Sequence, residues 1–214
     1  MKIFIAGGTG YIGRALIPLL IKQNHFVQGL VREKSINKLP AGCVPVFGNA
    51  LDNKSYIENI SLSDVFIHLV GVSHPNPSKK DQFRKIDLVS LKQSVEASAA
   101  LGIKHFIYVS VAHPAPLMKD YIKVRMECEE FIHTNGLNAS ILRPWYVLGP
   151  GHRWPYALIP FYKLMEKIPS TAESAKRLGL VTIRQLLNKL IYIIEHPGPG
   201  IRIIEVPEIR NGFK

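Results

Sequence analysis

The sequence contains little cysteine and no long apolar run, and both shortages limit the class of protein. Among its 214 residues, Cys43 and Cys128 are the only cysteines, which is typical of reduced thiols in the cytoplasm and not of a disulfide framework. No segment reaches the roughly 18 apolar residues of a membrane-spanning helix, and the apolar segment at residues 3–6 is too short for a signal peptide. We therefore expect a soluble cytoplasmic protein without a membrane span.

Clustered basic residues and metal-ligand patterns are also missing. Lysine and arginine exceed aspartate and glutamate by 27 − 16 = 11, which favours an anionic partner such as a phosphate-bearing ligand. The basic residues are scattered, in runs no longer than Lys79-Lys80, and no zinc-finger or aromatic RNA-binding signature occurs, so we expect no nucleic acid. No group of histidine, cysteine or carboxylate has metal-ligand spacing, so we expect no metal.

Apolar segments rich in β-formers alternate with segments of helical periodicity. Such alternation predicts an α/β fold with a doubly wound parallel sheet and helices on both faces. The predicted strands are residues 3–6, 26–31, 44–47, 65–70, 105–110 and 139–142. The predicted helices are residues 12–23, 82–101 and 119–134, with a weaker helix at 53–59.

Proline and glycine become more frequent after residue 151, and the alternation loosens. We expect residues 1–151 to form the core and residues 152–214 to form a reduced C-terminal lobe that completes the same domain. The lobe is predicted to contain helices at 156–167 and 183–196 and a last strand at 201–206.

Three glycines at the first strand-helix junction form the pattern Gly7-x-x-Gly10-x-x-Gly13. In a dinucleotide-binding turn of the Rossmann type, Gly7 makes the tight turn, Gly10 lets a diphosphate approach the backbone and Gly13 lets the helix pack against the strand. The alternative is an ordinary glycine turn, but the position directly between the first strand and its helix favours the dinucleotide site.

A basic residue, Arg32, follows the second predicted strand in "LVREK". An acidic residue at this place binds the ribose hydroxyls of NAD, whereas arginine accommodates the 2′-phosphate of NADP. We therefore expect NADP(H) to be preferred over NAD(H), with Lys34 and Arg14 as weaker candidates for the same phosphate. The alternative is that Arg32 is a solvated side chain.

Further segments follow the glycine motif in a characteristic order: "FGNALD" after strand three, "HLVGV" at strand four, "FIYVS" at strand five and "ILRPWYVLGPG" at strand six. With them the chain resembles the short-chain dehydrogenase/reductase superfamily, in particular its atypical and extended members, which are similar to nucleoside-diphosphate-sugar epimerases and to the NmrA-like group. The resemblance covers nearly the whole chain, most strongly residues 1–151, and implies a Rossmann-type fold that binds a dinucleotide.

The resemblance also implies which residues contact the cofactor. Asn49 stands where relatives have an aspartate on the adenine amino group, Gly71 and Val72 match the turn beside the ribose, and residues 144–147 match the segment over the nicotinamide. The implied cofactor contacts are Gly7, Thr9, Gly10, Tyr11, Ile12, Gly13, Arg32, Asn49, Ala50, Leu51, Gly71, Val72, Tyr121, Arg125, Pro144, Trp145 and Val147.

The catalytic set implied by the resemblance is a serine at the end of strand five and a Tyr-x-x-x-Lys motif on the next helix. Ser110 and Tyr121 match it, Val111 follows where many relatives have a hydroxyl residue, and Arg125 replaces the lysine. Tyr121 and Arg125 share a helix face at this spacing. A cation ~5 Å from the phenol at an effective dielectric of ~20 lowers its pKa by about two units. The alternative is that Tyr121 packs on the sheet and Arg125 takes no part in catalysis.

Histidine and aromatic side chains give additional candidates. His68 lies in an apolar strand and is expected in the core, whereas His74 and His113 follow strands four and five, where ligands bind in this architecture. The aromatic group Trp145, Tyr146, His152 and Trp154 either lines a substrate pocket or packs the lobe against the sheet.

Two functions agree with these patterns. The first is an NADP(H)-dependent oxidoreductase or epimerase-like enzyme that acts on a small carbonyl or alcohol, with Tyr121 as acid/base, Arg125 supporting it and Ser110 polarising the carbonyl. The alternative is a non-catalytic NAD(P)H-binding sensor or chaperone-like scaffold of the NmrA-like type.

Overall fold

A parallel seven-stranded sheet forms the centre of the molecule. The computed structural model describes residues 1–60, 62–115, 117–150, 165, 173 and 175–211. The strand order is β3-β2-β1-β4-β5-β6-β9, and every neighbouring pair is parallel. The strands are β1 Lys2–Ala6, β2 Phe26–Val31, β3 Val44–Phe47, β4 Val65–His68, β5 His105–Val109, β6 Ala139–Arg143 and β9 Ile201–Glu205. This topology confirms the predicted doubly wound sheet.

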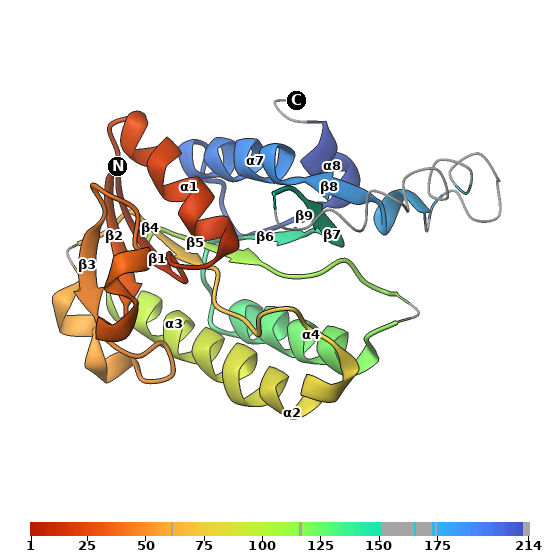
Figure 1. Ribbon diagram of the computed structural model, residues 1–214, viewed down its shortest axis with the longest axis horizontal. Helices are drawn as coiled ribbons and strands as arrows, with labels where there is room; N and C mark the ends of the chain where they lie inside the picture. Colours follow the sequence, from red (N-terminus) through yellow and green to blue (C-terminus); the bar gives the residue numbers. More distant parts are fainter. Residues whose placement is uncertain (61, 116, 151–164, 166–172, 174, 212–214) are drawn as a thin grey trace.

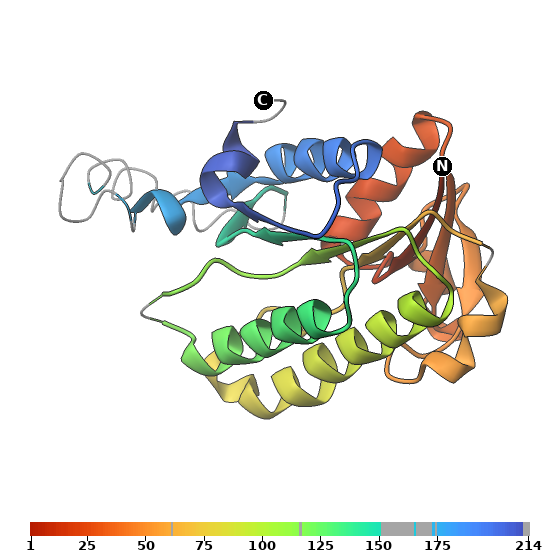
Figure 2. The same ribbon diagram turned by 180° about the vertical axis from the view of Figure 1, so that it is seen from behind.

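Helices cover both faces of the sheet, as Figures 1 and 2 show. Helices α1 (Tyr11–Lys22), α7 (Ile183–Glu195) and α8 (Val206–Arg210) pack on one face, and α3 (Val89–Ala100) and α4 (Lys119–Thr134) pack on the other. Each face has its own apolar core: Ile3, Ile5 and Leu16 belong to the first, and Phe4, Phe66 and Leu91 to the second. Burying each such side chain contributes about 1.5–3 kcal/mol to stability. Because successive residues of a strand point to opposite faces of the sheet, the strands stabilise the helix layers on both faces.

The predicted helix at residues 82–101 is interrupted. A short α-helix, α2 (Lys80–Gln82), continues into a π-helical segment, η5 (Phe83–Leu88), and only then into α3. π-Helical turns widen the backbone spiral and are frequent at functional sites. The segment places Asp87 in the protein interior, where its side chain is 0% exposed.

Short elements account for the other differences from the predicted boundaries. The weak helix at 53–59 consists of two 3₁₀ turns, η2 (Asn53–Ser55) and η3 (Ile57–Asn59), and another 3₁₀ segment, η1 (Glu33–Lys38), follows β2; a fourth, η4 (Pro77–Lys79), precedes α2. Strands β7 (Tyr146–Leu148) and β8 (Leu180–Thr182) form a second, two-stranded sheet that the periodicity did not predict.

The predicted helix at 156–167 lies outside the described residues, apart from Met165. Within the described part of the chain, no helix is long and apolar enough to cross a membrane.

Candidate functional site

The turn between β1 and α1 needs glycine at two positions for reasons internal to the fold. Gly7 has φ +93°, a conformation that favours glycine, and a Cβ there would lie 2.7 Å from the carbonyl carbon of Leu69. At Gly13 a Cβ would lie 2.6 Å from the carbonyl oxygen of Gly7. The backbone N–H of Gly10 donates to that same oxygen at 3.0 Å, which closes the turn. Gly7 and Gly13 therefore serve the turn itself.

Gly10 is different, because its backbone angles do not require glycine. Its φ of −79° and ψ of 179° are extended backbone angles that any residue adopts, and it is exposed. A Cβ at Gly10 would approach only the Gly7 oxygen, at 3.2 Å. Gly10 is also the N-cap of α1, whose first turn holds no acidic residue, and first-turn N–H groups attract anions. The bare backbone leaves room for a diphosphate, so the residues present fit a dinucleotide.

Arg32 and the segment after β3 lie side by side at one edge of this site. The ends of β2 and β3 are adjacent, because the N–H of Gly48 donates to the carbonyl of Val31 at 3.1 Å. Arg32 is exposed and forms no ion pair within the described residues. The side chain of Asn49 accepts a hydrogen bond from the N–H of Leu51 at 3.1 Å, which shapes the turn through Ala50.

The turn after β4 rests on a buried ion pair that the sequence did not reveal. Arg125 Nη2 lies 2.6 Å from Asp87 Oδ1, and the other oxygen of Asp87 accepts from the N–H of Val72 at 3.0 Å. A Cβ at Gly71 would lie 2.5 Å from Arg125 Nη2. The structure thus brings three of the predicted cofactor contacts, Gly71, Val72 and Arg125, together and adds Asp87 to them.

Arg125 contacts Tyr121 through the aromatic ring. Its guanidinium carbon lies 5.0 Å from the centroid of the Tyr121 ring, while Nη1 donates to the Tyr108 hydroxyl at 2.9 Å and to the Val109 carbonyl at 3.2 Å. Burial raises the pKa of Tyr121, and Arg125 offsets this only in part. The expected lowering by the cation is present, but desolvation of the phenol outweighs it, and Asp87 compensates part of the charge of Arg125.

Ser110 belongs to a second buried polar network. It is 6% exposed, and its hydroxyl donates to Glu129 Oε1 at 2.5 Å. Glu129 also pairs with Arg143 Nη2 at 2.5 Å and lies 3.5 Å from His113 Nε2, and Arg143 continues to Glu205 at 2.9 Å. Burial alone would raise the pKa of Glu129, but these hydrogen-bond donors outweigh it and the pKa is lowered. Ser110 points toward α4 in this structure.

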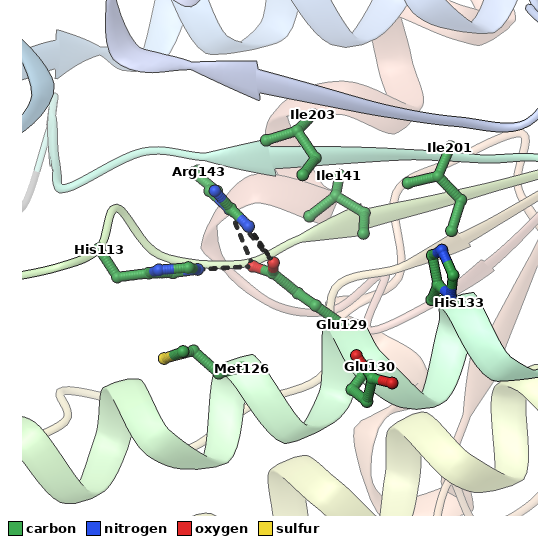
Figure 3. A pocket seen from close by; sticks show the side chains of 9 residues that line it. All are labelled: His113, Met126, Glu129, Glu130, His133, Ile141, Arg143, Ile201 and Ile203. Carbon is green, nitrogen blue, oxygen red and sulfur yellow. Dashed lines mark hydrogen bonds and ion pairs between the residues drawn. The ribbon is translucent and has the colours of Figure 1, made fainter.

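Figure 3 shows Glu129, Arg143 and His113 of this network at one wall of a cavity of 230 Å³ between α4 and the strands β6 and β9. Isoleucines of the two strands form its apolar side, and α4 supplies Met126, Glu130 and His133. Glu129 was missed in the sequence because "ECEE" reads as a solvated acidic stretch. Its spacing of four residues from Arg125 was the available signal, since it puts both on one helix face.

The remaining candidates occupy varied positions. Thr9, Tyr11 and Ile12 are half-buried at the glycine turn, and a Cβ at Gly149 would clash with the Tyr11 hydroxyl. Pro144 accepts a hydrogen bond from the N–H of Ala112 at 3.0 Å, Trp145 packs against the apolar core, and Val147 lies in β7.

The histidines divide between core and surface. His68 is 1% exposed and its Nδ1 lies 2.9 Å from Ser94 Oγ, which confirms it as a core residue. His74 is exposed beside Ser73. His152 and Trp154 lie outside the described residues. Within the ranges that the structure describes, no three histidine, cysteine or acidic side chains gather as metal ligands.

Comparison with known proteins decides the family. Residues 7–158 match the family model described as NAD(P)H-binding. The chain belongs to this NAD(P)H-binding family. Its turn, Gly7–Gly13, lies at the start of the match.

Individual relatives agree with this assignment. The chain is 21% identical to the ceramide reductase of Caulobacter vibrioides over 211 residues, 98% of the chain and 65% of that protein. It is 23% identical to the UDP-glucose 4-epimerase of Vibrio cholerae over 236 residues, 97% of the chain and 70% of the epimerase. The chain thus spans less than two thirds of the ceramide reductase.

A solved structure shows the same fold. A short-chain dehydrogenase/reductase superfamily protein from Agrobacterium tumefaciens with bound NAD superposes with a TM-score of 0.69 at 16% identity, covering 96% of this chain and 77% of that one. The predicted Rossmann-type fold is thereby confirmed.

Proposed function

We propose that the NAD(P)H-binding family member described here is an NADP(H)-dependent reductase of small carbonyl compounds. Gly10 carries the proposal, because this exposed glycine leaves the backbone at the N-terminus of α1 bare, where a diphosphate can approach the free N–H groups. Arg32, exposed at the end of β2, is proposed to receive the 2′-phosphate and thus to favour NADP(H) over NAD(H).

Tyr121 is the proposed proton donor. When bound, the reduced cofactor supplies the hydride for the carbonyl carbon, and the carbonyl oxygen then takes a proton from the phenol. Because burial raises the pKa of Tyr121, the phenol stays protonated at neutral pH. That state suits reduction, whereas oxidation of an alcohol, the first half of an epimerisation, needs tyrosinate as the base. The names of the ceramide reductase and of a quinoline-oxide ketoreductase among the relatives support the same direction.

Arg125 and Ser110 are assigned supporting roles. Arg125 lies against the Tyr121 ring and close to the Gly71 turn, so it is proposed to orient the phenol and to bind the cofactor ribose. Ser110 is proposed to polarise the substrate carbonyl, for which its hydroxyl must turn from Glu129. The thiols of Cys43 and Cys128 are free and buried, which supports the proposed cytoplasmic location.

Oxidation of NADPH by a panel of aldehydes and ketones tests the proposal. The wild-type protein is expected to consume NADPH with at least one of them and to form the alcohol. Tyr121→Phe should lose about 10²–10⁴-fold in turnover, the usual contribution of a general acid, while it binds NADPH normally. Equal turnover in the two proteins would rule out Tyr121 as the acid.

A second candidate function is a non-catalytic NADP(H) sensor or scaffold. It is favoured by two observations: Asp87 compensates the only cation that contacts Tyr121 in the described structure, and Glu129 holds the Ser110 hydroxyl. This candidate predicts that bound NADPH is not consumed by any carbonyl and that NADPH changes the affinity for a protein partner.

A further inference from the structure

Asp87 is a buried carboxylate that no sequence motif identified. It lies on the π-helical segment η5, and its side chain is 0% exposed. The two carboxylate oxygens bind different parts of the molecule: Oδ1 pairs with Arg125 on α4 at 2.6 Å, and Oδ2 accepts from the N–H of Val72 at 3.0 Å. Asp87 thereby joins α4 to the turn that follows β4.

This arrangement suits arginine and aspartate in particular. A fully buried carboxylate is costly unless a cation and hydrogen bonds compensate it. Arg125 does so while its second terminal nitrogen binds Tyr108 and the Val109 carbonyl. A lysine ammonium is a single point of charge on a flexible stem and does not reproduce such a fork. Arg125 in place of lysine and a carboxylate at position 87 therefore form a matched pair.

The charged and titratable groups that act on Tyr121 come from two elements. Arg125 on α4 stabilises tyrosinate, whereas Asp87 on η5 and Cys128 on α4 destabilise it. Tyr108 on β5 binds Arg125 and shares its charge. Phe83 of η5 covers the Tyr121 ring at 5.0 Å between centroids. Among these groups, Asp87 is the carboxylate paired with the cation.

We propose that Asp87 is a positioning residue that holds Arg125 beneath the Gly71–Val72 turn and compensates its charge, so that Tyr121 stays protonated, the state in which it can donate a proton to a carbonyl. The proposal rests on the proposed reductase function. It goes beyond that function by assigning control of the protonation state of Tyr121 to a residue that contacts neither cofactor nor substrate.

Two substitutions disturb the pair in opposite senses. Asp87→Asn removes the carboxylate charge and leaves Arg125 uncompensated, so the pKa of Tyr121 should fall by about 1–3 units. Arg125→Met removes the cation and leaves Asp87 unpaired, so the pKa of Tyr121 should rise. Glu129→Gln is the matched control, because it also neutralises a buried carboxylate in an ion pair on α4, away from Tyr121.

The readout is the ultraviolet absorbance of tyrosinate during titration from about pH 7 up to the highest pH at which each protein stays folded. Each protein is compared with the same protein carrying Tyr121→Phe, so that the difference reports Tyr121 alone. We expect a fall for Asp87→Asn, a rise for Arg125→Met and no change for Glu129→Gln. Shifts of the same sign in the first two variants, or no shift in either, would overturn the proposal. If Asp87→Asn does not fold, the double variant Asp87→Asn, Arg125→Met, which removes both charges, is compared with Arg125→Met alone: a lower pKa of Tyr121 in the double variant supports the proposal, and an equal pKa overturns it.

Activity separates this proposal from the proposed function. Because tyrosinate is the base in alcohol oxidation, the pH profile of alcohol oxidation with NADP⁺ should lie at lower pH in Asp87→Asn than in the wild-type protein. If the titration shifts have the expected signs but no carbonyl is reduced by any of the proteins, the reductase assignment fails while the effect of Asp87 on Tyr121 holds. Absence of the shifts in a protein that does reduce carbonyls would instead reject Asp87 as the positioning residue.

Discussion

Replacement of Gly10 by valine separates a ligand requirement from a folding requirement. The backbone at Gly10 is extended, with φ −79° and ψ 179°, and a Cβ would touch only the Gly7 oxygen at 3.2 Å. The loss of stability should be at most about 1 kcal/mol, the difference between a good and a poor helix N-cap. The valine side chain would instead fill the space outside the turn, where the diphosphate is expected.

The loss of affinity can be worked out from the first turn of α1. A diphosphate that accepts two backbone N–H bonds gains about 1.5–3 kcal/mol from each charge-assisted bond. Displacing it from both costs about 3–6 kcal/mol, or roughly 10²- to 10⁴-fold in the dissociation constant of NADPH. Such a loss is much larger than the change in stability, so the two effects can be measured separately.

Calorimetric titration with NADPH and thermal unfolding are the assays. Gly102→Ala is the control, because Gly102 has φ +62° and a Cβ there meets nothing within 4 Å. This variant should lose about 1–2 kcal/mol of stability through backbone strain and bind NADPH normally. If Gly10→Val bound NADPH as tightly as the wild-type protein, the diphosphate would not lie at this turn and the reasoning would be refuted.

Three other predictions concern cofactor choice, pH and packing. Arg32→Ala should weaken NADPH binding about 10- to 150-fold and leave NADH binding nearly unchanged; equal losses for both nucleotides would contradict the 2′-phosphate contact. Burial lowers the pKa of His68 to about 3 in the folded protein, whereas the unfolded chain binds a proton at His68 below about pH 6.5. The free energy of unfolding should therefore fall as the pH drops below about 6.5, by about 2 kcal/mol at about pH 5. Denaturant unfolding of His68→Asn, whose side chain can still bond to Ser94, should show a fall in the free energy of unfolding that is smaller by this amount. An unchanged pH dependence would exclude His68 as its source. Gly13→Ala should destabilise the fold itself, because its Cβ would lie 2.6 Å from the Gly7 oxygen, and a thermal midpoint equal to that of the wild-type protein would show that the turn can yield.

Local patterns were enough to predict the sheet. Strands β2 and β3 begin and end where the apolar runs do, and helix α4 coincides with the predicted residues 119–134. Turn residues bound these elements, and the apolar residues within each follow one clear periodicity. Neighbouring residues in the sequence are therefore enough to predict them. Strands β7 and β8 have three residues each, too few for a period to be recognised.

Only the part of the candidate site that consecutive residues form could be predicted from the sequence. The glycine turn is contained in seven consecutive residues, Gly7–Gly13, and its position after β1 could be inferred. The pairs of Asp87 with Arg125 and of Glu129 with Arg143 depend on how α4 packs against η5 and β6, which no spacing in the sequence specifies. The raised pKa of Tyr121 could not be predicted for the same reason, since it depends on burial by distant segments.

Crystallography of the complex with NADPH tests the central claim most directly, because it measures the distance between the Tyr121 hydroxyl and the nicotinamide ring. The account predicts a diphosphate against Gly10, the 2′-phosphate beside Arg32 and a nicotinamide within ~8 Å of the hydroxyl, which one bridging water can span. A nicotinamide farther away, or a nucleotide bound elsewhere, would contradict the assignment of Tyr121 as the proton donor.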